Sequence, residues 1–377
     1  MDVIKKEEIY SVRITEVILE DRILLIGAPG IGKTEVVKQK AEEEAKKLNK
    51  IFVDLREADD ELIQQIFENP SKYYVFIRVV APHVFPEDLG IPKMINHSTK
   101  DYVEFVPPKV LRVLSIPEIH GVLFIDEITN VQRDDQISMY YSIILEKEAG
   151  FQLRLSRNIK IICVGNPPEW SEIVRPLPKP LRNRMILLYV SPPTIEEWIK
   201  YMNERYNDGW EKLIGAYLKV YPEDFIKPPV NDWDNFPTPR SWTQLAIKLY
   251  GLRDKVSDDL MGSIVFGSVG REVGTRVLAL LRTKVDVKRI VNELKKNPEV
   301  FKELDLNQKI LVLNTISQMT IDKIKELDRF IRWLNINDRE MLVLTVLLME
   351  RKKRAEFIMT YKDVMNEVIR KMTEYLI

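Results

Sequence analysis

Gly27-Ala28-Pro29-Gly30-Ile31-Gly32-Lys33-Thr34 stands between the apolar run Ile23-Leu24-Leu25-Ile26 and a segment with helical periodicity. A glycine-rich loop between a strand and a helix is typical of a phosphate-binding P-loop, because glycine lets several backbone N–H groups turn toward one point. The positive end of the helix dipole strengthens this attraction for anions. We therefore expect residues 27–34 to bind nucleotide phosphates, with the Lys33 ammonium on the β- and γ-phosphates and the Thr34 hydroxyl on Mg²⁺. A glycine turn without a ligand is the less favoured alternative.

The composition is that of an ordinary globular chain of 377 residues, 45% hydrophobic and 30% charged, which is long enough for two or three domains. Lys+Arg 57 and Asp+Glu 57 cancel, so no global field attracts the chain to nucleic acid or anionic lipid. The only cysteine, Cys163, excludes a disulfide within the chain and a cysteine zinc site, and we expect it to be a small buried hydrophobe. The three histidines lack metal-ligand spacing.

Neither end of the sequence predicts export or membrane insertion. Residues 5–8 are Lys-Lys-Glu-Glu, where a secretion signal would be apolar. The apolar stretch from Met341 to Met349 is about half of the ~20 residues that span a bilayer. We therefore expect a cytoplasmic protein with no membrane span.

Apolar segments alternate with helical ones from the P-loop to about residue 190. The strand before the P-loop and its helix, 33–48, are followed by apolar runs with strand character at 51–55, 73–80, 121–126, 159–164 and 185–190. Near-continuous apolar strands that alternate with helices are typical of a parallel sheet covered on both faces. The predicted class is α/β, a P-loop NTPase sheet with an αβα core. Residues 1–20 give weak signals of a short helix or an extended lead-in, and an extra segment at 59–73 leaves the strand order open.

The second half of the chain has helical periodicity and no further convincing strand. We expect a Pro-rich loop at 222–239 that Trp233 and Phe236 order by packing. The predicted domains are a nucleotide-binding domain at 1–190, a helical lid at 191–300 and a helical C-terminal region at 301–377. The predicted helical segments are 194–220, 239–253, 257–283, 286–294, 307–318, 320–334 and 337–376.

An acidic pair follows the apolar strand Gly121-Val122-Leu123-Phe124-Ile125. Asp126 and Glu127 therefore stand at the carboxyl end of a buried strand, where α/β sheets bind their ligands. We expect Asp126 to hold Mg²⁺ through water and Glu127 to be the general base that orients the attacking water. The alternative is a helix-capping pair after a core strand, which the nearby P-loop makes less favoured.

Asn166 ends a third apolar strand, Ile161-Ile162-Cys163-Val164-Gly165. An amide at this position is expected to lie beside the γ-phosphate and to hydrogen-bond the nucleophilic water. The alternative is a turn residue, because Asn-Pro-Pro at 166–168 is also typical of a loop.

Together these motifs resemble the AAA+ ATPases over roughly residues 20–300. Within that family they resemble the MoxR branch of the helix-2-insert group and, more closely, the MoxR-like ATPases of prokaryotes and phages. In that branch a hairpin is inserted in the second helix, here about 81–108, and another hairpin, about 149–160, precedes the third strand with Phe151-Gln152-Leu153-Arg154-Leu155 as its first arm. The segments that carry the resemblance are Pro86 to Pro92, Val106-Pro107-Pro108, Ala149 to Asn158, Leu181 to Met185, Trp198, Pro237 to Trp242, and Ser268-Val269-Gly270.

The resemblance implies a homo-oligomeric ring, usually a hexamer, that binds ATP and Mg²⁺ between its subunits. Arg184 would be the arginine finger that reaches a neighbour's γ-phosphate, with Arg182 as the alternative at the same corner. Arg240 would contact the γ-phosphate of its own subunit from the lid. For each arginine the alternative is a surface salt bridge. Met185 departs from the family pattern, which has an aromatic residue there.

Two polar segments are open to more than one interpretation. The insert faces the ring pore in this branch, and Asn96 to Lys100 is either a mobile loop tip or a solvated turn. Arg351-Lys352-Lys353-Arg354 either binds nucleic acid or an acidic partner or, as is more usual for a charge run, is a solvated helix face.

The function that we expect is Mg²⁺-dependent ATP hydrolysis that remodels or assembles a protein partner, in the manner of MoxR-like chaperones. A protein client or a partner with a von Willebrand factor A domain would fit the resemblance. The alternative is a nucleic-acid motor or loader of the same insert group, which the zero net charge disfavours. A nucleotide-gated scaffold without hydrolysis is disfavoured by the intact Asp126–Glu127 pair.

Overall fold

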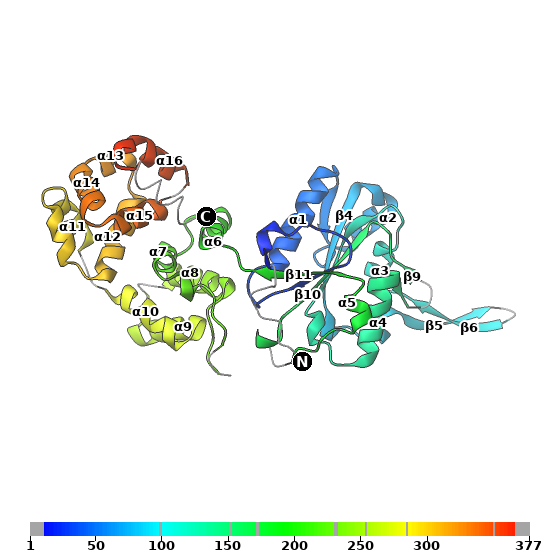
Figure 1. The fold of residues 1–377 in the computed structure, drawn as a ribbon. Coiled ribbons are helices and arrows are strands. Elements are labelled where there is room, and N and C mark those ends of the chain that lie inside the picture. Colours follow the sequence, from blue (N-terminus) through cyan, green and yellow to red (C-terminus); the bar gives the residue numbers. More distant parts are fainter. Residues whose placement is uncertain are drawn as a thin grey trace. The chain divides into compact units, whose positions relative to one another are not determined.

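The computed structural model describes residues 11–365 apart from 98–99, 151–152, 171–172, 230–232, 253–254, 284–285 and 350. The chain divides into two compact units, Met1–Pro193 and Thr194–Ile377 (Figure 1). The first unit contains all strands of the described residues, and the second is helical. The predicted limits of a lid and a C-terminal region, at 190 and 300, stay predictions.

The first unit is built on a seven-stranded sheet with parallel pairing throughout. Long apolar runs form its inner strands, as expected for a sheet that is buried on both faces. Its strands, in spatial order, are β1 (Ser11–Arg13), β11 (Ile186–Ser191), β2 (Ile23–Ile26), β10 (Ile159–Gly165), β7 (His120–Asp126), β4 (Tyr73–Val80) and β3 (Ile51–Asp54). The predicted α/β class is confirmed by this sheet and its helices.

Alternate side chains of the strands point to opposite faces of the sheet. Leu123 and Ile125 of β7 are buried in one core together with Tyr140 and Ile144 of α4 (Asp134–Glu146). Phe124 points to the other face and stacks on Phe76, with ring centroids 6.1 Å apart. The helices of this unit are α1 (Lys33–Lys47), α2 (Asp60–Glu68), α3 (Lys109–Leu114), α4 (Asp134–Glu146) and α5 (Lys179–Arg182).

The strand order settles what the sequence left open. β4 lies beside β7, and β3 is the outer strand, so the βα unit of β3 and α2 adds to the edge of the sheet. At the other edge, β1 pairs with β11 where the sequence gave only weak signals. Three residues are too few to show a periodic pattern, which is why this strand was not predicted.

Two hairpins branch from the first unit. The expected insert contains β5 (Ile91–His97) and β6 (Lys100–Val106), which pair antiparallel and extend away from the sheet as a ribbon (Figure 1). Met94 and Phe105 on this ribbon are 62% and 54% exposed. Of the predicted loop tip, Asn96 to Lys100, residues 98 and 99 lie outside the described residues, and the other three belong to the two strands. The second hairpin pairs β8 (Glu148–Ala149) with β9 (Leu153–Arg154), so Leu153 and Arg154 belong to its second arm and the prediction of a first arm was wrong.

The second unit consists of helices with two buried clusters. One cluster contains Trp198, Trp210 and Trp242, and the other contains Phe301, Phe330 and Phe357. Most predicted helical segments are confirmed, but four of them, 194–220, 257–283, 320–334 and 337–376, each contain two helices. The helices are α6 (Ile195–Tyr206), α7 (Lys212–Val220), α8 (Pro239–Leu252), α9 (Asp258–Val269), α10 (Arg271–Arg282), α11 (Val287–Leu294), α12 (Leu306–Gln318), α13 (Ile321–Lys325), α14 (Asp328–Asn337), α15 (Arg339–Leu348) and α16 (Arg351–Thr360).

The prediction for the Pro-rich loop before α8 is wrong for Trp233, which is 94% exposed, so burial of this side chain does not order the loop. Phe236 is partly buried and lines the pocket described below. The fully buried carboxylate of Asp224 holds the start of the loop through two ion pairs. Its Oδ1 lies 2.7 Å from Arg276 and 2.8 Å from Lys227. The Trp242 indole N–H donates to the backbone oxygen of Asp224 at 3.1 Å. Asp224 was not singled out in the sequence.

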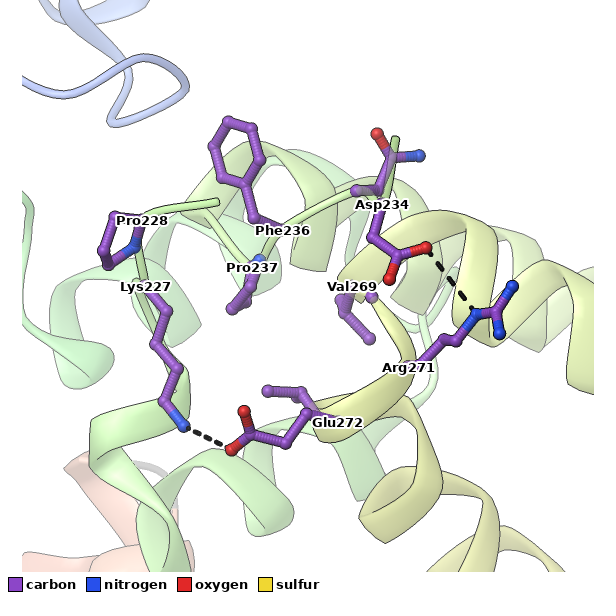
Figure 2. A pocket seen from close by; sticks show the side chains of 11 residues that line it. Lys227, Pro228, Asp234, Phe236, Pro237, Val269, Arg271 and Glu272 are labelled. Carbon is purple, nitrogen blue, oxygen red and sulfur yellow. Dashed lines mark hydrogen bonds and ion pairs between the residues drawn. The ribbon is translucent and has the colours of Figure 1, made fainter. Parts of the chain in front are cut away.

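A pocket of about 210 Å³ lies between this loop and the α9–α10 junction. Figure 2 shows two ion pairs on opposite sides of it, Lys227 with Glu272 at 3.3 Å and Asp234 with Arg271 at 3.6 Å. Gly270 joins the two helices with φ 78°, a conformation that favours glycine. The expected continuous helix at 257–283 is therefore interrupted at this residue.

The basic run at 351–354 contains an exposed side chain and two side chains that hydrogen-bond to the backbone of other helices. Lys352 is exposed, whereas Lys353 donates to the backbone oxygen of Ser317 at 3.2 Å and Arg354 to that of Leu347 at 2.9 Å. Two of its four cations therefore serve the packing of α16. In the described part of the chain, no helix is both long and apolar enough to cross a membrane.

Candidate functional site

Three neighbouring strands of the first unit end at the same edge of the sheet. β10 pairs with β2 on one side, with Gly165 opposite Ile26, and with β7 on the other, with Cys163 opposite Ile125. The carboxyl ends of parallel strands meet at one edge, where open α/β sheets bind ligands. The P-loop, the acidic pair and Asn166 follow these three strands, so the sheet brings the three predicted motifs together.

The P-loop connects β2 to α1 and has the backbone geometry that its glycines predict. Gly30 and Gly32 have φ values of 73° and 92°, and Gly32 is the N-cap residue of α1. Ile31 is 1% exposed and anchors the loop in the core, while Ala28 precedes the turn that contains Pro29 and Gly30. The N–H of Gly27 donates to the backbone oxygen of Gly165 at 3.3 Å, which ties the loop to the end of β10.

Lys33 begins α1, and its ammonium folds back over the loop. It donates to the backbone oxygens of Gly27 at 2.6 Å and Ala28 at 2.8 Å and to the side-chain oxygen of Asn166 at 3.0 Å. The residue is only 8% exposed. A hydrogen bond from a cation to an anion is stronger than one to a neutral carbonyl or amide oxygen. We therefore expect the Lys33 ammonium to leave these neutral acceptors when an anion binds at the N-terminus of the helix.

Thr34 and Asp126 meet although 92 positions separate them. The Thr34 hydroxyl lies 3.4 Å from Oδ2 of Asp126, and the N–H of Glu127 donates to Oδ1 at 3.0 Å. Asp126 is 7% exposed. A hydroxyl beside a carboxylate fits Mg²⁺, which prefers oxygen ligands and completes its shell with water and substrate phosphates. The described residues include no group of three or more acidic, His or Cys side chains arranged for a metal.

Glu127 has an unusual backbone. Its φ of 57° lies in the left-handed region, which a Glu rarely adopts. Its carboxylate accepts a hydrogen bond from the side-chain amide of Asn130 at 3.4 Å, and the N–H of Asn130 donates to the backbone oxygen of Glu127 at 2.8 Å. A tight turn directly after β7 thus aims this carboxylate, and strain of this kind is concentrated at functional sites.

Asn166 is held from both sides. Its side-chain oxygen accepts from Lys33, while its backbone N–H donates to the hydroxyl of Thr129 at 3.1 Å. Thr129 is buried and lies in the turn after the acidic pair, so it joins the ends of β7 and β10. The sequence did not point to Thr129, because its partner is 37 positions away.

Arg78 is a further residue of this site that the sequence did not reveal. It lies in β4, and its guanidinium forms an ion pair with Oδ2 of Asp126 at 2.7 Å. The only signal was a single cation in the apolar run Tyr-Tyr-Val-Phe-Ile-Arg-Val-Val at 73–80. That signal could not be interpreted while the neighbour of the acidic strand was unknown.

No family model matches the chain, and no curated protein matches it. Solved structures resemble it weakly. NtrX from Brucella abortus in complex with ADP is 16% identical over 93% of this chain and 66% of its own, with a TM-score of 0.36. The RuvB Holliday junction branch migration motor from Thermotoga maritima is 15% identical over 75% of this chain and 70% of its own, with a TM-score of 0.29.

Hsp104, reconstructed in a closed state with ATPγS and casein, is 12% identical over 84% of this chain, with a TM-score of 0.37. The chain spans 48% of the length of that Hsp104 chain and 66% of that of NtrX. Identities and TM-scores of this size do not identify the family.

The three predicted arginines lie on exposed surfaces. Arg182 ends α5 and Arg184 lies in the turn after it, while the neighbouring Met185 is buried at 8% exposure. Arg240 lies in the first turn of α8 in the second unit. Among the described residues none of the three lies within ion-pair distance of a carboxylate, and their roles stay predictions.

Proposed function

We propose that the chain is a Mg²⁺-dependent ATPase of the AAA+ type that resembles the MoxR branch and couples hydrolysis to the remodelling or assembly of a protein partner. One observation carries the proposal. The Lys33 ammonium, 3.0 Å from Asn166, and the Thr34 hydroxyl, 3.4 Å from Asp126, join the P-loop to the ends of two other strands. A sheet edge with this set of groups supplies what phosphoryl transfer needs, namely positioning and charge.

In this proposal, each group has one task. Backbone N–H groups of residues 27–34 hold the phosphates, and Lys33 leaves the loop carbonyls for the β- and γ-phosphates. Thr34 and Asp126 hold Mg²⁺, which when bound neutralises charge on the phosphate oxygens. Glu127 accepts a proton from the attacking water, and the Asn166 amide orients that water.

Two arginines complete the proposed site. Arg184 acts on the γ-phosphate held by a neighbouring subunit, which requires a homo-oligomer, expected to be a hexamer. Arg240 contacts the γ-phosphate of its own subunit. Both side chains are exposed, as expected for groups that reach a phosphate from another element.

The proposal is tested by binding of labelled ATP and release of phosphate in the presence of Mg²⁺. Lys33→Ala should lose both, whereas Glu127→Gln should retain binding and lose turnover by about 10²–10⁴-fold, the usual share of a general base. Lys38→Ala is the matched control, since Lys38 lies on the same helix and pairs with Asp54 at 2.9 Å, away from the loop.

Retained hydrolysis in Glu127→Gln would remove the role of Glu127, and absence of binding in the unaltered chain would refute the ATPase. DNA added to the same assay tests the alternative of a nucleic-acid motor. We expect no stimulation, because the chain has no net positive charge. A several-fold, salt-sensitive rise in rate would instead favour the motor.

A further inference from the structure

Arg78 has no task in the proposed reaction, yet it is in direct contact with a residue assigned to the metal. Its Nε donates to Oδ2 of Asp126 at 2.9 Å, and a terminal nitrogen lies 2.7 Å from the same oxygen. It reaches Asp126 from the adjacent strand, where Arg78 is paired with Phe124. The side chains are 31% and 11% exposed, so water screens this pair only in part.

The contact satisfies a physical requirement of the site without a metal. A largely buried carboxylate is costly unless a counter-charge or hydrogen bonds accompany it. Oδ1 accepts the N–H of Glu127, which leaves Oδ2 as the oxygen that needs a cation. The guanidinium supplies that cation with two donors directed at one oxygen.

The same oxygen is the one that faces Thr34. The Thr34 hydroxyl is 3.4 Å from Oδ2, so a Mg²⁺ held between Thr34 and Asp126 would draw on the atom that Arg78 occupies. Two cations at one partly buried oxygen repel each other. Arg78 and Mg²⁺ are therefore alternatives at this atom.

We propose that Arg78 is a positioning residue that competes with Mg²⁺ for Oδ2 of Asp126. It holds the carboxylate in place before the metal arrives and raises the Mg²⁺ concentration that tight nucleotide binding requires. The inference rests on the proposed function, because it assumes that this edge binds a Mg²⁺-nucleotide.

The test measures binding of a fluorescent ADP analogue during a titration with MgCl₂, together with direct binding of Mn²⁺ followed by its electron paramagnetic resonance signal. In Arg78→Gln the half-saturating concentration of either metal should fall about three- to tenfold, since a competing ion pair has been removed. Arg78→Lys, which keeps the charge but loses the two-donor geometry, should lower it less.

Arg56→Gln is the matched control. Arg56 forms an ion pair with Asp54 at 2.8 Å at the end of β3. The substitution therefore also removes one positive charge beside a buried carboxylate, but this carboxylate lies away from the P-loop. The metal requirement of this variant should equal that of the unaltered chain.

An unchanged or raised metal requirement in folded Arg78→Gln would overturn the inference and leave the proposed ATPase intact. If the Gln variant does not fold, Arg78→Lys decides alone, and an unchanged requirement there also overturns it. If the unaltered chain binds no nucleotide at any metal concentration, the proposed function fails and the inference fails with it.

Discussion

Lys219 on α7 is a partly buried cation of the helical unit that finds no carboxylate within ion-pair distance among the described residues. Burial, together with the positive charge of Arg354, lowers its pKa to about 8, against a weaker opposing effect of Glu196. The folded state therefore binds this proton less tightly than the unfolded chain. Stability should accordingly be reduced at neutral pH and recover as the pH rises from 8 toward 10.5.

Lys219→Met should raise the free energy of unfolding by about 1–2 kcal/mol at pH 7, because it removes a buried charge and keeps the apolar stem. The gain should shrink as the pH approaches 10. Urea unfolding at the two pH values measures both. Lys200→Met is the control, since Lys200 is 70% exposed and should give no gain. An equal gain at both pH values would show that the charge is not the cause.

At the same residue scale, the sequence predicts those parts of the site that depend on local backbone. Gly30 and Gly32 were expected from the loop pattern and adopt the left-handed φ that it requires. Arg78 and Thr129 could not be predicted, because their roles depend on which strands are neighbours. The conformation of a loop depends mainly on residues that are adjacent in the sequence. Contacts between strands depend on the strand order of the sheet, which the sequence does not show directly.

Among the elements, the α9–α10 junction depends on one glycine. A Cβ at Gly270 would lie 2.4 Å from the backbone oxygen of Asn235, and φ is 78°. Gly270→Ala should therefore destabilise the second unit by about 1–3 kcal/mol, through strain and displacement of the Pro-rich loop.

Gly251→Ala is the matched control for that substitution. Gly251 lies in α8, and a Cβ there meets nothing within 4 Å, so alanine should be neutral or slightly stabilising. Urea unfolding followed by tryptophan fluorescence compares the two. Equal stability of both variants would contradict the role given to Gly270.

Long apolar runs made the inner strands of the sheet predictable, since burial on both faces leaves a clear pattern. The pattern gave no correct prediction where a strand is short or where a single residue ends a helix. β1 has three residues, and Gly270 divides a segment with uniform helical periodicity. The expectation that Trp233 helps to order the Pro-rich loop fails because this side chain is 94% exposed, whereas the buried carboxylate of Asp224 pairs with Arg276 and Lys227.

At the scale of the whole molecule, the proposed arginine finger means that each active site needs Glu127 of one subunit and Arg184 of its neighbour. Arg184→Ala and Glu127→Gln should each be inactive, but a mixture should recover activity where an intact Glu127 meets an intact Arg184. Random mixing gives about a quarter of such interfaces. Phosphate release from the mixture measures the recovery.

The same mixture made with Arg182→Ala tests the alternative finger. We expect Arg182→Ala to keep activity by itself, so that mixing brings no recovery. No recovery with Arg184→Ala in assembled rings would count against a role of Arg184 between subunits.

The burial of Cys163 has a practical consequence for following such assemblies. It is the only cysteine, it is 0% exposed in β10, and burial raises the pKa of its thiol. Since thiolates are the species that react, the natural chain should resist maleimide dyes without any substitution. A single cysteine introduced at an exposed position, such as Met94 on the β5–β6 ribbon, would then carry the only label in each subunit.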